Sequence, residues 1–258
     1  SEAVFWISAT GFLFTSVFAL LSLLFFIFWE EKKRAVYFVI SLCSAIFALL
    51  FHELGIVTPL LIISYKFAGE GRFSLKEIIK NFYFRVLLLP IPVYLAMRFT
   101  AGSHWSGGDY SYNLLKLPFN VAGNLIGYLF LTLFGPASLP FYNALRNFSK
   151  EQMLFSAVFF LIVLYIMFWL YRMVITRLEQ NERGVVVIGL AFFIIALLPF
   201  LGLGNIASRY SYLASFGIVL LLAFFVQKLY RVLQRQSQNI AKAAIAVVIA
   251  LFCLLQII

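Results

Sequence analysis

The sequence predicts an all-α integral membrane protein, a polytopic bundle of helices, and three observations support this. Of the 258 residues, 64% are hydrophobic and only 12% are charged, whereas soluble domains are about half apolar and a quarter charged. The apolar residues form long runs, most of them near the roughly 20 residues that cross a bilayer. The basic residues gather between these runs. Soluble enzymes and nucleic-acid-binding proteins are therefore poor candidates, despite a net charge of +10.

The apolar runs are the predicted helices, and they form a single transmembrane domain over residues 1–258. The runs that carry Pro59, or Pro90 and Pro92, are short. Such helices are tolerated in a membrane where neighbouring groups satisfy the freed backbone. The predicted helices are 4–29, 35–51, 54–66, 84–99, 119–136, 153–172, 184–202, 211–230 and 240–258.

The positions of lysine and arginine predict the orientation. Short basic loops stay on the cytoplasmic side of a membrane. Most of the 20 basic residues lie in the stretches 32–34, 66–85, 172–183 and 228–242, which we therefore place in the cytoplasm. About eight crossings follow from the run lengths. The N- and C-termini of the chain are then expected outside, and the compact loops favour a bacterial inner membrane.

The same rule predicts an unusual segment in the middle of the chain. The segment 35–66 is a predicted hairpin with its tip outside. Run 153–172 must deliver the chain to a cytoplasmic loop, so the outer segment 100–152 begins and ends outside. Run 119–136 is therefore expected to be a re-entrant or interfacial helix. The alternative is an ordinary crossing with one weakly basic loop on the wrong side, because the rule is statistical.

His52 and Glu53 stand between two apolar stretches, at the predicted hairpin tip. An ionisable residue at mid-bilayer costs roughly 2.5–3.5 kcal/mol on insertion scales, so it usually faces a cavity or a partner. We assign both residues as candidate catalytic residues, with His52 as a partner or proton carrier for Glu53. The alternative is that both lie at the water interface of a tight turn and have no chemical role.

Arg209 precedes a predicted helix at an outer loop and is a candidate phosphate ligand. A guanidinium binds phosphate through two parallel hydrogen bonds, and the amides at a helix start favour an anion. Tyr210 and Tyr212 are expected to line the same pocket. Arg98, at the outer end of run 84–99, is a second candidate. Interfacial aromatic residues and snorkelling arginines are the alternative for all four.

The outer loop around residues 102–112 is rich in glycine, aromatic and polar residues. His104 and Asp109 are candidate pocket residues there, suited to a carbohydrate or another polar acceptor. A flexible interfacial loop is the alternative. The chain has only two histidines and two cysteines, Cys43 and Cys253, both within apolar runs. A divalent metal therefore remains an option, but the sequence forms no complete metal site.

Several separated motifs occur in order along nearly the whole chain. They are residues 2–8 for "EAVxWIS", residues 52–60 for "KExGIxxPL" with His52 in place of Lys, Pro136, Leu139 and Tyr142 for "PxxLxxxY" with one residue fewer before Tyr, Leu197, Leu198, Pro199 and Asn205 for "LLPxxN" with a longer spacing before Asn, and residues 208–217 for "ERYLYLPSxG" with Ser208 in place of Glu and Ala214 in place of Pro. Together these motifs resemble the protein O-mannosyltransferase-like membrane proteins of the GT-C class of glycosyltransferases, in the group that often carries tetratricopeptide repeats.

The resemblance implies an inverting transfer of a sugar from a polyprenyl-phosphate carrier to a protein, lipid or glycan acceptor at the outer face of the membrane. In the family an acidic base lies in a first outer loop, which would precede Ser1. The arginine and aspartate that often follow the first motif are replaced by Ala9, Thr10, Gly11 and Phe12. We therefore expect this chain to be an internal piece of a longer GT-C-like enzyme.

The working hypothesis is a membrane glycosyltransferase core whose partners are membrane lipid, a polyprenyl-phosphate sugar and an outer acceptor, without nucleic acid. The alternative is a non-catalytic membrane subunit or scaffold that packs against partner helices and lipid. The 31 phenylalanines favour that alternative, because they make broad apolar surfaces. A transporter is less favoured, since the predicted spans hold few ionisable residues and no inverted repeat is visible.

Overall fold

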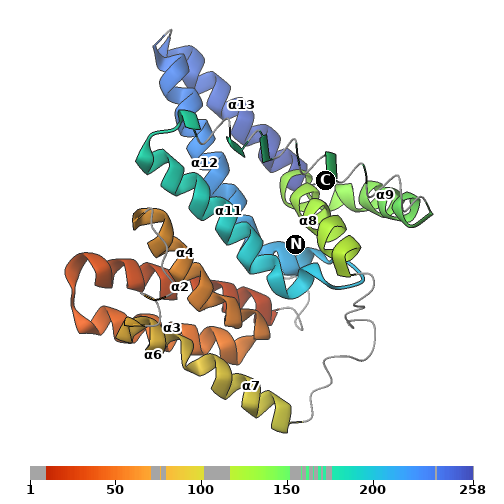
Figure 1. Ribbon diagram of the computed structural model, residues 1–258. Helices are drawn as coiled ribbons and strands as arrows, with labels where there is room; N and C mark the ends of the chain where they lie inside the picture. The colour runs from red at the N-terminus through yellow and green to blue at the C-terminus, as the bar shows by residue number, and fades with distance from the viewer. Residues whose placement is uncertain are drawn as a thin grey trace.

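The computed structural model describes residues 10–70, 76, 80–101, 117–151, 158, 161–162, 165, 168–169, 171–172, 176–235 and 237–257. Over this part of the chain the protein is helical and has no strand. The described helices form two groups in Figure 1, one made by those between residues 10 and 100 and the other by those between residues 117 and 257.

The helices follow the predicted apolar runs closely. Because Pro90 has no backbone N–H, run 84–99 is divided at Leu89 into two helices. The elements are α2 (Thr10–Lys32), α3 (Ala35–Phe51), η2 (Glu53–Val57), α4 (Thr58–Glu70), α6 (Phe82–Leu88), α7 (Pro90–Thr100), α8 (Leu117–Phe134), η4 (Pro136–Ser138), α9 (Leu139–Glu151), α11 (Gln180–Leu201), η5 (Ser208–Ser211), α12 (Tyr212–Gln234) and α13 (Gln238–Ile257).

Helices α2 and α3 pack side by side through small polar residues. The Ser22 hydroxyl donates to the Ser41 carbonyl at 2.8 Å, and the Ser41 hydroxyl donates to the Ser22 carbonyl at 2.7 Å. The Thr15 hydroxyl donates to the Ala48 carbonyl at 3.1 Å. Small residues let helix backbones approach closely, and buried hydroxyls that bond across the interface hold the pair together in an apolar environment.

The helix α4 leaves the hairpin tip and packs mainly on α11 rather than on α3. The turn before it is tight: a Cβ added at Gly55 would lie 2.4 Å from the backbone of Leu49 and Ala48. A larger residue would therefore force the two limbs of the 35–66 segment apart. The structure keeps the predicted change of direction at His52, with α11 as the main neighbour of the second limb.

The helices α11 and α12 cross at two glycines. A Cβ at Gly217 would lie 2.5 Å from the carbonyl oxygen of Gly189 and 2.7 Å from the backbone nitrogen of Phe193. The two backbones are therefore in direct contact. This is the small-residue packing that brings helices together in lipid, where apolar burial alone gives little advantage over lipid contact.

The helix α9 runs back along α8 in the opposite direction. The Phe141 and Phe130 rings lie 5.9 Å apart, Tyr142 bonds to Asn124, and Arg146 bonds to Asn120. Contacts thus move toward the start of α8 as the chain advances along α9. Between the two helices, Gly135 adopts φ 72°, a left-handed conformation that suits glycine.

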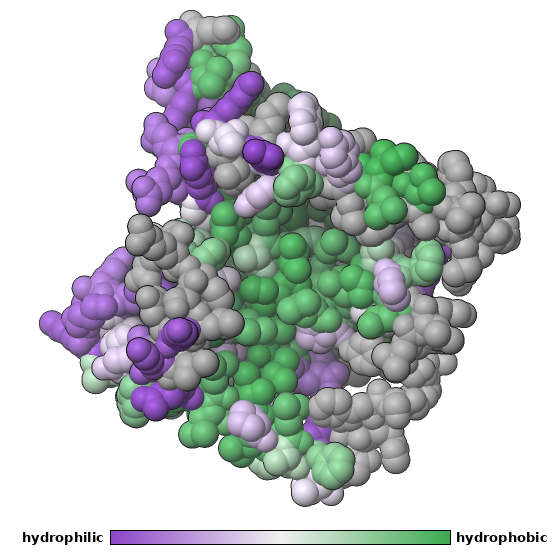
Figure 2. Space-filling model, in the orientation of Figure 1, coloured by the Kyte–Doolittle hydropathy of each residue, from purple (hydrophilic) through white to green (hydrophobic). Residues whose placement is uncertain are grey.

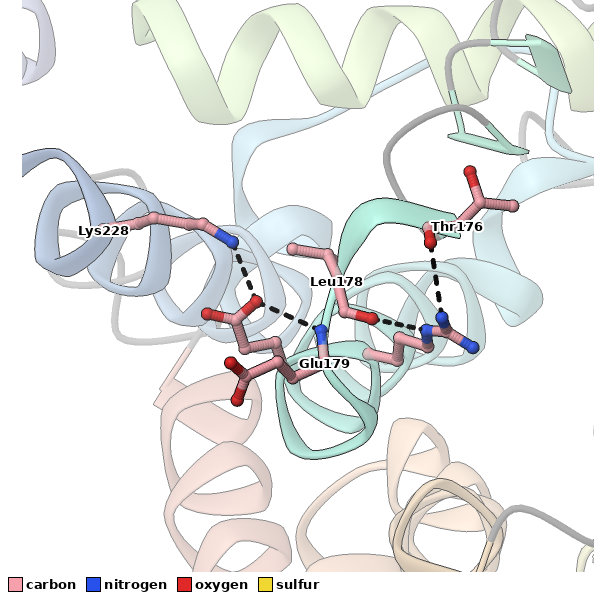
Figure 3. A network of polar contacts seen from close by, with 6 residues as sticks. Thr176, Leu178, Glu179 and Lys228 are labelled. Carbon is pink, nitrogen blue, oxygen red and sulfur yellow. Dashed lines mark hydrogen bonds and ion pairs between the residues drawn. The ribbon is translucent and has the colours of Figure 1, made fainter. Parts of the chain in front are cut away.

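The predicted cytoplasmic loops meet at one end of the molecule. Lys66 on α4 pairs with Glu30 on α2 at 2.6 Å, and Lys228 on α12 pairs with Glu182 on α11 at 2.8 Å. Figure 3 shows the second pair, in which the Glu182 carboxylate also accepts from the Glu179 amide. The start of α11 lies beside the end of α4, since a Cβ at Gly184 would be 3.2 Å from a carbonyl of that helix.

The surface is that of an integral membrane protein. Within the described residues, six helices are long and apolar enough to cross a membrane, and α8 is one of them. The predicted crossings 35–51 and 54–66 correspond to shorter helices, and most of run 153–172 lies outside the described residues. In Figure 2 hydrophobic residues cover the centre of the face, and hydrophilic residues gather along its left and upper edge.

Candidate functional site

The predicted hairpin tip is a structured turn that orients His52. His52 ends α3 in an extended conformation and begins η2. Its Nδ1 accepts a hydrogen bond from the Leu54 amide at 3.1 Å, and its ring lies 3.9 Å from the Phe12 ring. Because Nδ1 is the acceptor, a neutral imidazole here carries its proton on Nε2. The turn therefore presents a fixed N–H donor.

Glu53 forms an ion pair with Arg98, which sits near the end of α7. The Arg98 guanidinium also donates to the Tyr94 hydroxyl at 3.1 Å, one helical turn earlier. The Glu53 side chain is 42% exposed and that of Arg98 30% exposed. The pair is thus open to solvent on one side, and an incoming anion or hydroxyl group can reach it.

Arg209 and Tyr210 lie in η5, the short turn that leads into α12. The Arg209 guanidinium carbon is 5.0 Å from the centre of the Tyr210 ring, and its Nη2 donates to the Tyr210 hydroxyl at 3.4 Å. Tyr210 is only 5% exposed and stacks on Phe200 with ring centres 4.2 Å apart and an interplanar angle of 5°. The buried aromatic stack fixes the place of the half-buried arginine.

These residues, distant in sequence, meet at the end opposite the basic loops. Phe12 links them, because its ring lies 3.9 Å from that of His52 and 5.5 Å from that of Tyr210. Burial lowers the pKa of His52, Glu53 raises it, and the charges of Arg98 and Arg209 lower it further, with a net shift downward. His52 is therefore close enough to both arginines to feel their charge, and it is neutral near pH 7.

Of the remaining predicted residues, the structure describes only Tyr212. Tyr212 begins α12 and is 39% exposed. His104 and Asp109 lie outside the described residues. No group of three or more histidine, cysteine, aspartate or glutamate side chains that could hold a metal occurs in the part of the chain that the structure describes.

Sequence reasoning missed a second polar cluster next to the first. The Asn124 amide donates to the carbonyls of Leu203 at 2.8 Å and Leu201 at 3.0 Å, and the Tyr142 hydroxyl donates to the Asn124 Oδ1 at 3.0 Å. The Asn120 amide donates to the Gly202 carbonyl at 3.3 Å. Arg146 donates to the Gly204 carbonyl and to the Asn120 Oδ1. We call this group the trans cap; it comprises Asn120, Asn124, Tyr142 and Arg146.

A signal for the trans cap existed in the sequence. Asn120, Asn124 and Tyr128 are spaced by four residues within an apolar run, which puts them on one stripe of a helix. Polar residues on one stripe indicate a buried partner. The hydroxyl of fully buried Tyr128 has no hydrogen-bond partner of good geometry among the described residues. It faces the Ala207 amide, one residue before η5.

Comparison of the chain with protein-family models, curated proteins and solved structures finds no match.

Proposed function

We propose that the chain is the core of a GT-C-like membrane glycosyltransferase that uses a sugar donor linked to a polyprenyl phosphate. The observation that carries the proposal is the convergence of His52, Glu53, Arg98 and Arg209 at one end of the bundle, with Phe12 and Tyr210 between them. The sequence motifs and the predicted topology single out the four ionisable residues of this group. Exposed apolar side chains flank these charges, including Phe51 next to His52 and Phe99 next to Arg98. They suit a ligand with a charged head and a prenyl tail.

The charge of the cluster matches such a donor. Among the described residues the cluster brings together the guanidinium groups of Arg98 and Arg209, the carboxylate of Glu53 and the neutral His52. A polyprenyl-phosphosugar is a phosphodiester with a single negative charge. Guanidinium groups bind such oxygens with charge-assisted hydrogen bonds, which are stronger than neutral ones. We therefore assign the donor phosphate to Arg209, with Arg98 as a second ligand once the phosphate competes with Glu53.

The proposed reaction breaks the bond between the sugar C1 and the phosphate oxygen. The acceptor hydroxyl oxygen forms the new bond to C1 and gives up its proton to a carboxylate that acts as the base. The leaving phosphate keeps the electron pair of the broken bond. Negative charge thus grows on the leaving phosphate, where a preplaced guanidinium stabilises the transition state. In this scheme His52 Nε2–H and the Glu53 carboxylate orient the donor sugar. The proposal assigns no general base among the described residues.

The proposed topology puts this cluster on the outer face of an inner membrane. The positive-inside rule supports it, because the ion pairs Lys66–Glu30 and Lys228–Glu182 share the opposite end. The antiparallel contacts of α9 with α8 support a re-entrant hairpin over 119–136 that walls a groove for the prenyl chain. The 18-residue length of α8 suits an ordinary crossing equally well.

The test measures sugar transfer from prenyl-phosphate-linked mannose and glucose by the longest natural chain that contains this sequence. We expect Arg209→Ala to reduce turnover by about 10²–10³-fold, the effect of losing a group that stabilises developing charge. Glu53→Gln should reduce turnover by about 10²-fold, because the carboxylate that orients the donor sugar is lost. It should keep phosphate affinity, because Arg98 no longer has a competing carboxylate. Arg235→Ala, an exposed arginine at the end of α12, is the matched control.

Full activity in both site variants would remove the site assignment. A wild-type protein that is folded and binds no prenyl phosphate would instead favour the alternative of a non-catalytic membrane subunit. Thermal unfolding of each variant in detergent separates loss of chemistry from loss of fold.

A further inference from the structure

The end of α11 is an unusual helix terminus, because other helices supply its capping groups. The last four carbonyls of an α-helix have no partner within the helix. Here the carbonyls of residues 200 and 201, and those of residues 202 to 204 just beyond the helix, accept hydrogen bonds from side chains of α8 and α9. The carbonyl of residue 200 also accepts from the Leu203 amide. Arg146 adds a positive charge at the negative end of the helix dipole. The trans cap therefore holds the backbone at the point where the chain leaves α11.

Asn124 is the centre of the trans cap. It is fully buried, and its amide group bonds to carbonyls of α11 while its Oδ1 accepts from the Tyr142 hydroxyl. Tyr142 is 4% exposed. The hydroxyl of Tyr142 thus fixes which way the Asn124 amide faces, since an amide turned by 180° would set its oxygen against the carbonyls. The pair acts as one unit.

Glycine makes room for this unit. A Cβ at Gly127 would lie 2.5 Å from the Tyr142 ring, whereas a Cβ at Gly123, one turn earlier, would lie 3.9 Å from the Tyr142 hydroxyl. Alanine at position 127 therefore displaces Tyr142, and alanine at position 123 meets it at ordinary contact distance. The two positions give a matched pair of substitutions on one helix.

The backbone that the trans cap holds leads directly to the candidate site. Phe200, whose carbonyl accepts from Asn124 at 3.4 Å, stacks in parallel on Tyr210. Tyr210 in turn lies under the Arg209 guanidinium. A shift of the 200–204 backbone therefore moves the aromatic stack, and with it Arg209, whose charge acts on His52.

We propose that Asn124 and Tyr142 are positioning residues that hold Arg209 in place for an anionic phosphate ligand. The α8–α9 pair is thus part of the binding site without touching the ligand. The proposal rests on the phosphate-binding role of Arg209, but its structural step, control of the 203–211 backbone, stands by itself.

The experiment compares Gly127→Ala, Gly123→Ala and Tyr142→Phe in the full chain in detergent. Hydrogen exchange of the amides of residues 203–211 reports the loop, and binding of farnesyl phosphate reports the arginine. We expect Gly127→Ala to speed exchange of this segment and to weaken phosphate affinity about tenfold, the equivalent of about 1.4 kcal/mol. Tyr142→Phe, which removes one hydroxyl and keeps the ring, should change both in the same direction. Gly123→Ala should match the wild type.

Equal exchange and equal affinity in Gly127→Ala and Gly123→Ala would overturn the proposal. Wild-type exchange and wild-type farnesyl phosphate affinity in Tyr142→Phe would also overturn it. This variant keeps the aromatic ring, so it removes the hydroxyl with little change in packing. If exchange responds as expected but the wild type binds no farnesyl phosphate, the positioning of Arg209 for phosphate and the proposed function fail together. If the wild type binds and transfers sugar but the variants do not differ, only the positioning role fails.

Discussion

His52 shows how one residue can combine structure and charge at the candidate site. Its ring is packed on Phe12, its Nδ1 caps the turn at Leu54, and both arginines act on it electrostatically. A protonated imidazole would lose the Nδ1 acceptor and would add positive charge beside two guanidinium groups. The fold therefore selects the neutral form, as the lowered pKa indicates.

The lowered pKa of His52 predicts a loss of stability in acid. Its ordinary value is 6.5, and burial is the largest cause of the downward shift. Below pH 6.5 the unfolded chain takes up a proton that the folded chain refuses, so the free energy of unfolding falls as the pH decreases toward the folded-state pKa. Thermal unfolding in detergent from pH 8 to pH 5 should show this decline in the wild type.

The variant His52→Asn is the comparison for this effect, because a side-chain carbonyl can replace Nδ1 as the acceptor for Leu54. We expect the variant to have a weaker dependence of stability on pH in this window. An identical pH profile in both proteins would contradict a shifted titration at His52.

The sequence pointed to ionisable residues that lie together in the structure, but it did not show their partners. His52, Glu53, Arg98 and Arg209 were predicted because ionisable residues beside apolar runs are costly unless they have a role. That Arg98 pairs with Glu53 depends on where α7 lies against the hairpin tip, which no local pattern encodes. The spacing of Asn120, Asn124 and Tyr128 indicates a polar stripe, but it does not encode the carbonyl partners of Asn124, which lie 77 and 79 residues further along the chain.

At the scale of helices, the crossing of α11 and α12 depends on the absence of side chains at two positions. A Cβ at Gly217 would meet backbone atoms of Gly189 and Phe193, which cannot move without the helix. A Cβ at Gly189 would instead meet the end of the Leu221 side chain at 2.6 Å, which can rotate away, together with a carbonyl at 3.1 Å. The two glycines are therefore unequal.

We predict that Gly217→Ala lowers the free energy of unfolding by about 1–3 kcal/mol, as overpacking does in cores. Gly189→Ala should cost less, and in both cases the better helix propensity of alanine offsets part of the loss. Gly69→Ala is the control, since this exposed position of α4 has nothing within 4 Å of an added Cβ. Denaturant unfolding in micelles measures all three, and equal stability of the two interface variants would refute the asymmetry.

The helices themselves were largely predictable, for a simple physical reason. A membrane helix must satisfy its backbone internally, so long apolar runs become helices whatever lies beside them. Run 35–51 coincides with α3, and run 211–230 lies within α12 apart from its first residue, Ser211. The break at Leu89 follows from Pro90. The packing of α4 on α11 was not predictable, because it depends on close backbone approach rather than on hydropathy.

Across the whole molecule, charge divides the bundle into two ends. The basic loops meet through Lys66–Glu30 and Lys228–Glu182 at one end, and the candidate site lies at the other. Positive charge in short loops keeps an end in the cytoplasm. The proposed orientation therefore puts Arg209 on the outer side, where the proposed donor and acceptor would meet, and it predicts that α9 lies on that side too.

The side of the membrane on which α9 lies tests the topology. Cys43 and Cys253 are both exposed, so they are first replaced by serine. Single cysteines are then placed by Asn143→Cys, Gly204→Cys and Lys33→Cys, all at exposed positions. Arg146 of α9 bonds to the Gly204 carbonyl, so α9 and Gly204 lie at the same end of the bundle. A membrane-impermeant thiol reagent should therefore label Asn143→Cys and Gly204→Cys from the same, outer side. Lys33→Cys should be labelled only after the membrane is opened.

Labelling of Asn143→Cys together with Lys33→Cys would make α8 an ordinary crossing. In that case Arg146 would have to reach the Gly204 carbonyl from the cytoplasmic side, and its side chain is too short to cross the membrane. This outcome would therefore contradict both the contacts between α9 and the end of α11 and the re-entrant topology.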